Sequence, residues 1–275
     1  MGFSVVTNLS SLNAQAQLDK TGLGLQQTLT RLSSGLRINS ASDDAAGLAV
    51  ANRFRMDNAG LHVGIRSAND AVGRLQIEDG TANNISSLLD RALTLAAQAA
   101  STTFLGSRAT LDTEFQSVLS EITREATSSG LETSNTNLNT RSVFVGNTSI
   151  STANSVTYVS FALSSAIDSQ GLGISTQNIT NQANAVAAVA ALQTAVGTLD
   201  TVQGKIGSAM NRLQYAMAQA QSMSVAVAAS ESRIRDANIA EEAANLTKFN
   251  ILNQSGLAAL AQANQSSSSV LSLLR

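Results

Sequence analysis

The chain has 275 residues and a formal net charge of −2, and it contains no cysteine, which excludes disulfides, thiolate metal sites and thiol nucleophiles. Aromatic residues make up only 3%, and neither tryptophan nor proline occurs, so long helices are expected rather than a large aromatic core. The sequence has no basic run, no stretch of roughly 18 apolar residues and no basic start followed by an apolar core. Nucleic-acid binding, membrane insertion and a classical signal peptide are therefore not expected.

The first helical segment is expected over residues 4–36, where apolar residues recur in two successive registers. The first register contains Leu9 and Leu12, and the second contains Leu18, Leu25, Leu29, Leu32 and Leu36. The change of register near Asp19 predicts a weak point in the helix. Because most helical stability comes from packing an apolar face, this segment is expected to stay frayed or disordered until it finds a partner.

A polar joint follows this segment. Gly35 can end the first helix, Ser40 or Ser42 can cap the next one, and Asp43 and Asp44 fall in its first turn, where the helix dipole favours anions. Paired aspartates could also act as acid–base groups or as metal ligands. Since no histidine lies nearby in the sequence, we interpret the pair as part of a helix start.

A long helix is expected from Ala45 to about Ser101, followed after a short turn by an antiparallel helix over residues 108–127. The long segment follows a heptad pattern, although Asp79 and Ser86 fall on its apolar seam. Its apolar positions are Ile65, Ala68, Val72, Leu75, Ala82, Leu89, Leu93 and Ala96. Its glycines, at positions 60, 64, 73 and 80, each cost up to about 1 kcal/mol relative to alanine, which the close approach of another helix would explain.

Between residues 128 and 180 the helical period disappears, and serine, threonine, asparagine and glycine dominate. Alternating apolar residues at 143–145 and 156–163 indicate two or three strands, and Gly146-Asn147 supplies one plausible turn between them. This region is predicted to form a small β-hairpin.

The most regular pattern lies between Val189 and Ile234, where a heptad seam continues without a slip. At about 1.5 Å per residue it makes a helix roughly 70 Å long, which needs partner helices of similar length. A charged joint at residues 231–242 and a last amphipathic segment complete an almost palindromic order. The predicted fold is therefore mainly α: a long antiparallel helical rod or coiled coil, a small β-hairpin region and paired terminal helices.

Both ends of the chain resemble the signatures of bacterial flagellins. The resemblance is carried by LSSGLRINSASDDAAGLA at residues 32–49, SRIRDANIA at 232–240, residues 254–265, and VLSLL at 270–274. The departures are modest: Ser42 stands where the family often has lysine, Asn238 where aspartate is usual, and Ser266–Ser269 where proline often occurs. The short middle implies a short form that lacks the variable outer domains.

The resemblance implies a structural subunit that self-assembles into the flagellar filament for motility. It assigns residues 1–39 and 237–275 to the N- and C-terminal inner-tube helices, 40–127 and 181–236 to the outer-tube helices, and 128–180 to the irregular β-hairpin region. The terminal helices would order on polymerisation. The expected assembly residues are Leu25, Leu29, Leu32, Leu36, Leu246, Phe249, Leu252, Leu257 and Leu260.

Flagellins are exported unfolded through a type III apparatus, so an extracellular filament is the expected location. The partners implied are further copies of the chain, the export apparatus, an export chaperone, and the filament cap and junction proteins. No cofactor or metal is implied. The resemblance also places the Arg, Leu and Glu that contact a vertebrate Toll-like receptor at Arg91, Leu95 and Glu114, although Arg91 and Glu114 could equally line a contact between subunits.

An enzyme is not expected, because the single histidine, His62, cannot supply the zinc-binding histidine pair of protease insertions. Two alternatives remain besides the filament subunit. A hook–filament junction protein would bind filament ends without polymerising alone. A secreted receptor ligand or adhesin would act as a monomer with stable ends.

Overall fold

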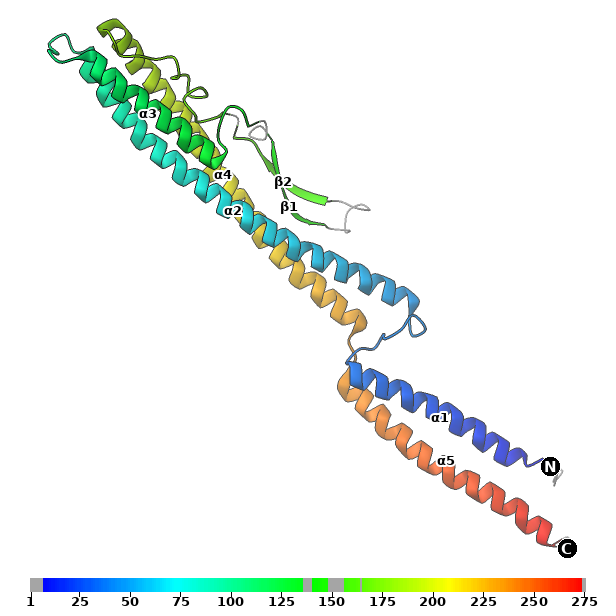
Figure 1. The fold of residues 1–275 in the computed structure, drawn as a ribbon. Helices are drawn as coiled ribbons and strands as arrows, with labels where there is room; N and C mark the ends of the chain where they lie inside the picture. Colours follow the sequence, from blue (N-terminus) through cyan, green and yellow to red (C-terminus); the bar gives the residue numbers. More distant parts are fainter. Residues whose placement is uncertain (1–6, 136–139, 148–155, 164, 274–275) are drawn as a thin grey trace. The chain divides into compact units, whose positions relative to one another are not determined.

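The computed structural model describes residues 7–135, 140–147, 156–163 and 165–273. These residues form five helices and one two-stranded antiparallel sheet, which confirms the predicted mainly α fold with a small β-hairpin (Figure 1). The elements in chain order are α1 (Leu9–Ser34), α2 (Ala45–Ala100), α3 (Arg108–Ser129), β1 (Arg141–Asn147), β2 (Val156–Phe161), α4 (Gln182–Arg235) and α5 (Ile239–Leu273).

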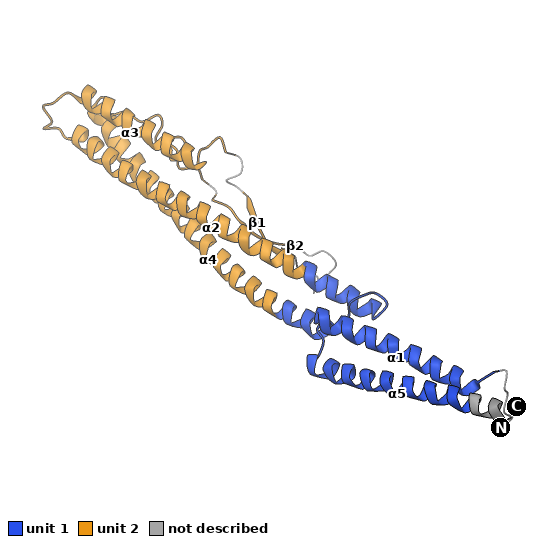
Figure 2. Cartoon of the chain, turned by 60° about the horizontal axis from the view of Figure 1, so that its bottom comes forward, with its two compact units in different colours: residues 1–56, 226–275 blue, residues 57–225 orange. Residues whose placement is uncertain are grey.

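The chain divides into two compact units, which Figure 2 colours separately. Unit 1 comprises Met1–Met56 and Ala226–Arg275, and therefore contains α1 and α5 with the joints that lead into and out of them. Unit 2 comprises Asp57–Val225 and contains the hydrophobic core of α2, α3 and α4, with the sheet beside it. The described ends of the chain thus belong to one unit and the middle to the other.

Within unit 2, α2 and α4 run antiparallel, as hydrogen bonds from Gln203 to Asn83 and from Ser224 to Asn58 show. One of the two predicted apolar columns on each helix is confirmed as core, with almost no exposed surface. On α2 this column is Ala68, Leu75, Ala82, Leu89 and Ala96, and on α4 it is Leu192, Leu199, Ile206, Leu213 and Ala220.

Over much of each seam the second column lies one residue before its predicted position. On α2, Glu78 and Ile85 are buried where Asp79 and Ser86 were expected, and on α4 the buried residues of this column are Ala188, Ala195, Val202 and Ala209, whereas Ser224 is buried at its predicted position. The predicted positions Val189, Val196 and Met210 are partly buried at the edge of the same core. The reason is that α3 joins α2 and α4, so the buried stripe is wider than the two-column seam of a coiled coil.

The sheet pairs β1 with β2 from Arg141↔Phe161 to Asn147↔Val156, with an irregularity between Phe144 and Gly146. The predicted turn at Gly146-Asn147 is wrong, because both residues belong to β1 and pair with β2. The connection between the strands falls in residues 148–155, outside the described residues. A β-bulge is the ordinary way in which a strand absorbs one extra residue and bends, and the irregularity between Phe144 and Gly146 is of this kind.

In unit 1, α1 and α5 lie side by side along their lengths (Figures 1 and 2). Helix α1 is continuous from Leu9 to Ser34, without a break near Asp19, and it ends at Gly35, which has the left-handed φ of 71° that glycine adopts readily. The two joints are tied by backbone hydrogen bonds from Arg37 N to Arg235 O (2.7 Å) and from Ala237 N to Gly35 O (2.9 Å).

The aspartate pair before α2 has the structural role that the sequence indicated, with one change. Asp44 rather than a serine caps the helix, because its Oδ1 accepts a hydrogen bond from Gly47 N at 2.8 Å. Asp43 lies in the preceding loop, where its Oδ2 accepts from the amides of Asn39 (3.1 Å) and Ser40 (2.9 Å). Both carboxylates are therefore used locally to form the helix start.

By length and composition, α4 is apolar enough to cross a membrane, with a mean hydropathy of 1.4 in its most apolar window. The buried column from Leu192 to Ala220 packs in the core of unit 2. An amphipathic core helix of this kind accounts for the apolar composition without a membrane.

Candidate functional site

Where α1 and α5 lie side by side, five of the predicted assembly residues, four leucines and one phenylalanine, are partly buried. Leu25 and Leu32 of α1 and Leu246, Phe249 and Leu260 of α5 are each partly covered. Two glycines let the side chains of the other helix approach closely: a β-carbon on Gly24 would stand 2.7 Å from the Phe249 ring, and one on Gly256 would stand 2.8 Å from Leu18 Cδ1. Small residues on one helix thus receive large side chains from the other.

Polar contacts fix the register of this helix pair. Arg31 Nη1 lies 3.4 Å from Glu242 Oε1 near one end, and Asn8 Nδ2 donates to Ala263 O at 2.9 Å near the other. Thr21 is buried in the interface, and its hydroxyl is satisfied by donating to Gln17 O within α1 at 2.8 Å. An interface that includes buried threonine and half-buried leucine is less apolar than a protein core, which limits how much it stabilises the pair.

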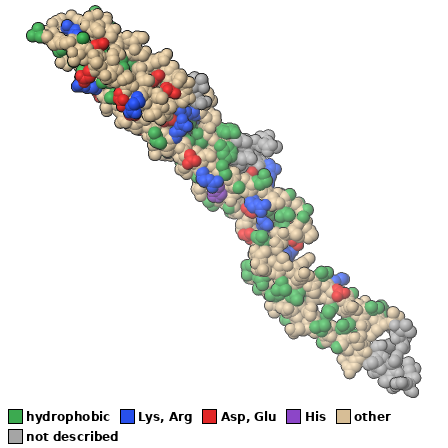
Figure 3. Space-filling view, viewed as in Figure 1, with side chains coloured by type: hydrophobic (Ala, Val, Ile, Leu, Met, Phe, Trp, Pro, Cys, Tyr) green, Lys and Arg blue, Asp and Glu red, His purple; other side chains and the backbone are tan. Residues whose placement is uncertain are grey.

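The other predicted assembly residues are largely exposed. Leu29, Leu252 and Leu257 retain 47%, 42% and 52% of their surface, so the pairing of α1 with α5 does not bury them. Further large apolar side chains are exposed on the same two helices: Leu9, Leu12, Leu23, Ile239 and Ile251. On the face seen in Figure 3, apolar side chains gather over α1 and α5. We call these eight residues the terminal apolar surface.

The sequence contained a signal for part of this surface. The early register of Leu9 and Leu12 lies on the side of α1 opposite the later register of Leu18, Leu25 and Leu32, which faces α5. The change of register therefore marks two apolar faces on one continuous helix, not a break. Leu36 differs from the other assembly residues, because it follows the end of α1 and forms a β-bridge with Asp236 in the joint.

The residues predicted to contact a receptor lie in unit 2, on α2 and α3. Arg91 donates from Nε to Glu114 Oε1 at 3.1 Å, and the two side chains are 57% and 46% exposed. Leu95 is only 2% exposed and belongs to the hydrophobic core. The structure therefore brings Arg91 and Glu114 together at the surface and places Leu95 beneath it. An exposed ion pair of this kind stabilises the fold by at most about 1 kcal/mol, so both side chains can exchange partners at little cost.

Comparison with known proteins finds a match to one protein family in each half of the chain. Residues 5–149 match the model of the bacterial flagellin N-terminal helical region, and residues 189–274 match that of the C-terminal helical region. The chain is 33% identical to a flagellin of Halalkalibacterium halodurans and 32% identical to the flagellar filament 33 kDa core protein of Treponema phagedenis, in each case over 98% of both chains. A flagellin of Listeria innocua is 31% identical over 95% of this chain and 96% of its own.

The geometry of the site agrees with this relationship. The terminal apolar surface and the Arg91–Glu114 pair are exposed surfaces suited to contact with other proteins. The chain belongs to the bacterial flagellin family, and it is a structural subunit of the extracellular flagellar filament rather than an enzyme.

Proposed function

We propose that α1 and α5 build the inner tube of the filament and that the terminal apolar surface is the part of the subunit that neighbouring copies cover. In this division residues 1–39 and 237–275 are inner-tube segments, 40–127 and 181–236 are outer-tube segments, and 128–180 is the hairpin region. The observation that carries the proposal is the exposure of eight large apolar side chains on α1 and α5. Monomeric proteins rarely leave apolar surface of this extent uncovered.

The same surface supports the proposal that the ends order on polymerisation. Ordering the two terminal segments costs conformational entropy, and pairing them buries only part of their apolar surface. Burial of the remainder against further copies would offset that cost, so folding of the ends is coupled to assembly. Growth should then require seeds and a minimum concentration of subunits.

Serine substitutions at Leu29 and Leu257 test this role. Each leucine is about half exposed, so losing both from a subunit contact should weaken it by about 1.4 kcal/mol or more and raise the critical concentration at least tenfold. The measurement is seeded elongation of the purified full chain, followed by sedimentation and negative-stain electron microscopy. The matched control is Ile77→Ser, because Ile77 is 67% exposed on α2 in unit 2. Normal elongation of the double variant would reject the role.

The exposed apolar side chains of α5 support a proposal for one further partner, the export chaperone. Before assembly the subunit needs a protein that covers α5, and we propose that the export chaperone binds there after synthesis. The type III export apparatus, the filament cap and the junction proteins would meet the chain before, during and at the base of assembly. Co-purification of a chaperone with the wild-type chain, and its loss in Leu252→Ser/Leu257→Ser, would support this order of events. If that variant retained the chaperone, these two residues would be excluded from the chaperone contact.

A second function, binding to a vertebrate Toll-like receptor, is favoured by the position of Arg91 and Glu114. Their charged groups lie together at the surface, where a receptor could replace the partner of either one. Leu95 would support α2 from below, because it is buried. Arg91→Ala/Glu114→Ala should lower receptor signalling by monomers at least tenfold, whereas Glu121→Ala/Arg124→Ala, an exposed pair elsewhere on α3, should leave it unchanged. Unchanged signalling by the first variant would end this proposal.

A further inference from the structure

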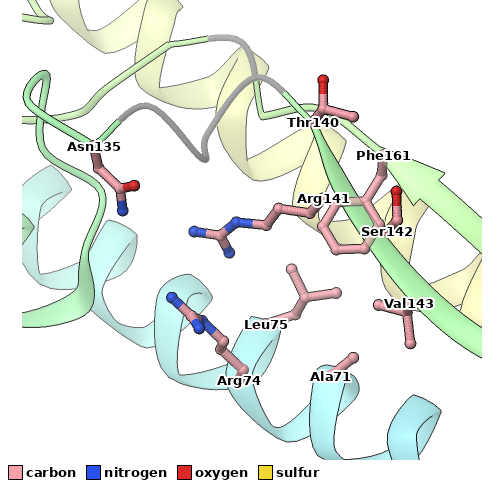
Figure 4. A pocket seen from close by; sticks show the side chains of 9 residues that line it. All are labelled: Ala71, Arg74, Leu75, Asn135, Thr140, Arg141, Ser142, Val143 and Phe161. Atoms are coloured by element: carbon pink, nitrogen blue, oxygen red, sulfur yellow. The ribbon is translucent and has the colours of Figure 1, made fainter.

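A pocket of about 370 Å³ lies in unit 2 where β1 passes over α2 (Figure 4). Its wall combines two arginines, Arg74 from α2 and Arg141 from β1, with apolar side chains that include Leu75, Val143 and Phe161. Among the described residues that line it, these two arginines are the only ones that ionise. The volume falls in the range of ligand-binding sites in proteins.

The two arginines share a single carboxylate. Glu78, whose side chain is 1% exposed, accepts a hydrogen bond from Arg74 Nε at 3.1 Å on its Oε1, and the same oxygen accepts from Arg141 Nη1. Two positive groups against one negative group leave a surplus of one positive charge at the pocket. Figure 4 shows both guanidinium groups directed toward the space between α2 and Asn135.

The donors of these guanidinium groups are not all used. Arg141 Nη2 is shielded from solvent and has no hydrogen-bond partner among the described residues, and the same is true of Glu78 Oε2. Buried polar atoms without partners are costly and commonly mark a place for a water or an ion, here beside the Glu78–Arg141 pair. Arg74 is 62% exposed, so its outer nitrogens can reach a ligand in the mouth of the pocket.

We propose that this pocket binds a small oxyanion, a carboxylate or a phosphate group, held between Arg74 and Arg141. Planar guanidinium groups bind such anions through paired hydrogen bonds. The apolar part of the wall lowers the local dielectric and strengthens the attraction. The space exceeds that of a bare oxyanion, which leaves room for a few carbon atoms attached to it.

The oxyanion can come from two sources, free phosphate in solution or a carboxylate side chain of a second copy in the filament. The first experiment uses the full-length monomer. Inorganic phosphate is titrated at constant ionic strength, and binding is followed by calorimetry and by the arginine Nε–H signals in NMR. The expected result is saturation at one phosphate per chain, with perturbation of the Arg74 and Arg141 signals.

Arg74→Gln should weaken phosphate binding at least tenfold. The matched control is Arg124→Gln, because Arg124 is exposed to a similar extent, 60%, and is also paired with glutamate. A response that never saturates, or equal weakening by both variants, would overturn the proposal. If Arg141→Gln does not fold, Arg74→Gln still decides the outcome, because most of the Arg74 side chain is outside the core.

The second experiment repeats the titration on assembled wild-type filaments, and it is the only part that depends on the filament function. Loss of phosphate binding on assembly identifies a carboxylate of a second copy as the natural occupant. Retained binding identifies a free oxyanion. Both results support the pocket as an oxyanion site, and the monomer titration alone can reject it.

Discussion

Gly64 of α2 lies directly against the backbone carbonyl oxygen of Val145 in β1, with no room for a β-carbon between them. The contact falls at the irregular part of β1, where Gly146 also packs closely on Leu61. The expectation that α2 glycines permit a close approach is thus confirmed at position 64, but the approaching element is a strand. At Gly73 and Gly80 a β-carbon would meet no atom within 4 Å, so close packing does not explain those two glycines.

Alanine should therefore have opposite effects at two glycines of the same helix. Gly73→Ala should raise the free energy of unfolding by about 0.5–1 kcal/mol through helix propensity alone. Gly64→Ala should lower it by about 1–3 kcal/mol, because β1 has to move away. Urea unfolding followed by circular dichroism gives both values. In a Tyr215→Phe background, the fluorescence of Tyr158 on β2 reports displacement of the strands. Stabilisation by both variants would show that β1 does not pack at Gly64.

The free energy of unfolding should depend strongly on the presence of both Glu78 and Arg141. Arg141→Met leaves the buried Glu78 carboxylate with Arg74 alone and should cost up to about 3 kcal/mol, the lower end for breaking a buried pair. Glu78→Leu/Arg141→Met removes both buried charges and should recover most of that loss. A urea double-mutant cycle measures the coupling between the two positions. Additive effects of the two single substitutions would contradict a direct interaction.

The helices and one buried column on each long helix were predictable from periodicity, because a seam such as Leu192 to Ala220 recurs over many turns. The second column was displaced because sequence spacing does not reveal how many partners a helix has. Asp79 and Ser86 looked like interruptions of the seam, whereas the residues before them, Glu78 and Ile85, occupy it. Only the third helix of the bundle explains the difference.

The candidate site was predictable in part. The leucines of α1 and α5 were identified as one group, but only the structure separates Leu25 and Leu32, which face the partner helix, from Leu29, which does not. The pocket between Arg74 and Arg141 had no sequence signal, since the two residues come from elements far apart in the chain. Such juxtapositions depend on where β1 crosses α2, which periodicity does not determine.

Asp43 makes the stability of the loop before α2 depend on pH. Hydrogen bonds from the backbone amides of Ser40 and Asn39 lower the pKa of the Asp43 carboxyl below its ordinary value of 3.8. A lowered folded-state pKa means that the ionised form stabilises the folded loop above about pH 4, and that this stabilisation is lost as the pH falls through the folded-state pKa. NMR titration of the Asp43 carboxyl carbon should show a midpoint below 3.8. Asp43→Asn should abolish acid-dependent exchange of the Ser40 amide, and a midpoint at or above 3.8 would contradict the hydrogen bonds.

Gly24 and Phe249 offer the most direct test of the pairing between α1 and α5. A β-carbon at Gly24 would lie 2.7 Å from the Phe249 ring, whereas one at Gly22 would meet nothing within 4 Å. Gly22→Ala should therefore slow hydrogen exchange of the α1 amides through helix propensity, by up to about fivefold for 1 kcal/mol. Gly24→Ala should show less protection than Gly22→Ala, because the ring has to shift. Adding Phe249→Leu to Gly24→Ala should raise the protection toward that of Gly22→Ala, because the ring is removed. Equal protection in both single variants would mean that the ring does not pack against Gly24.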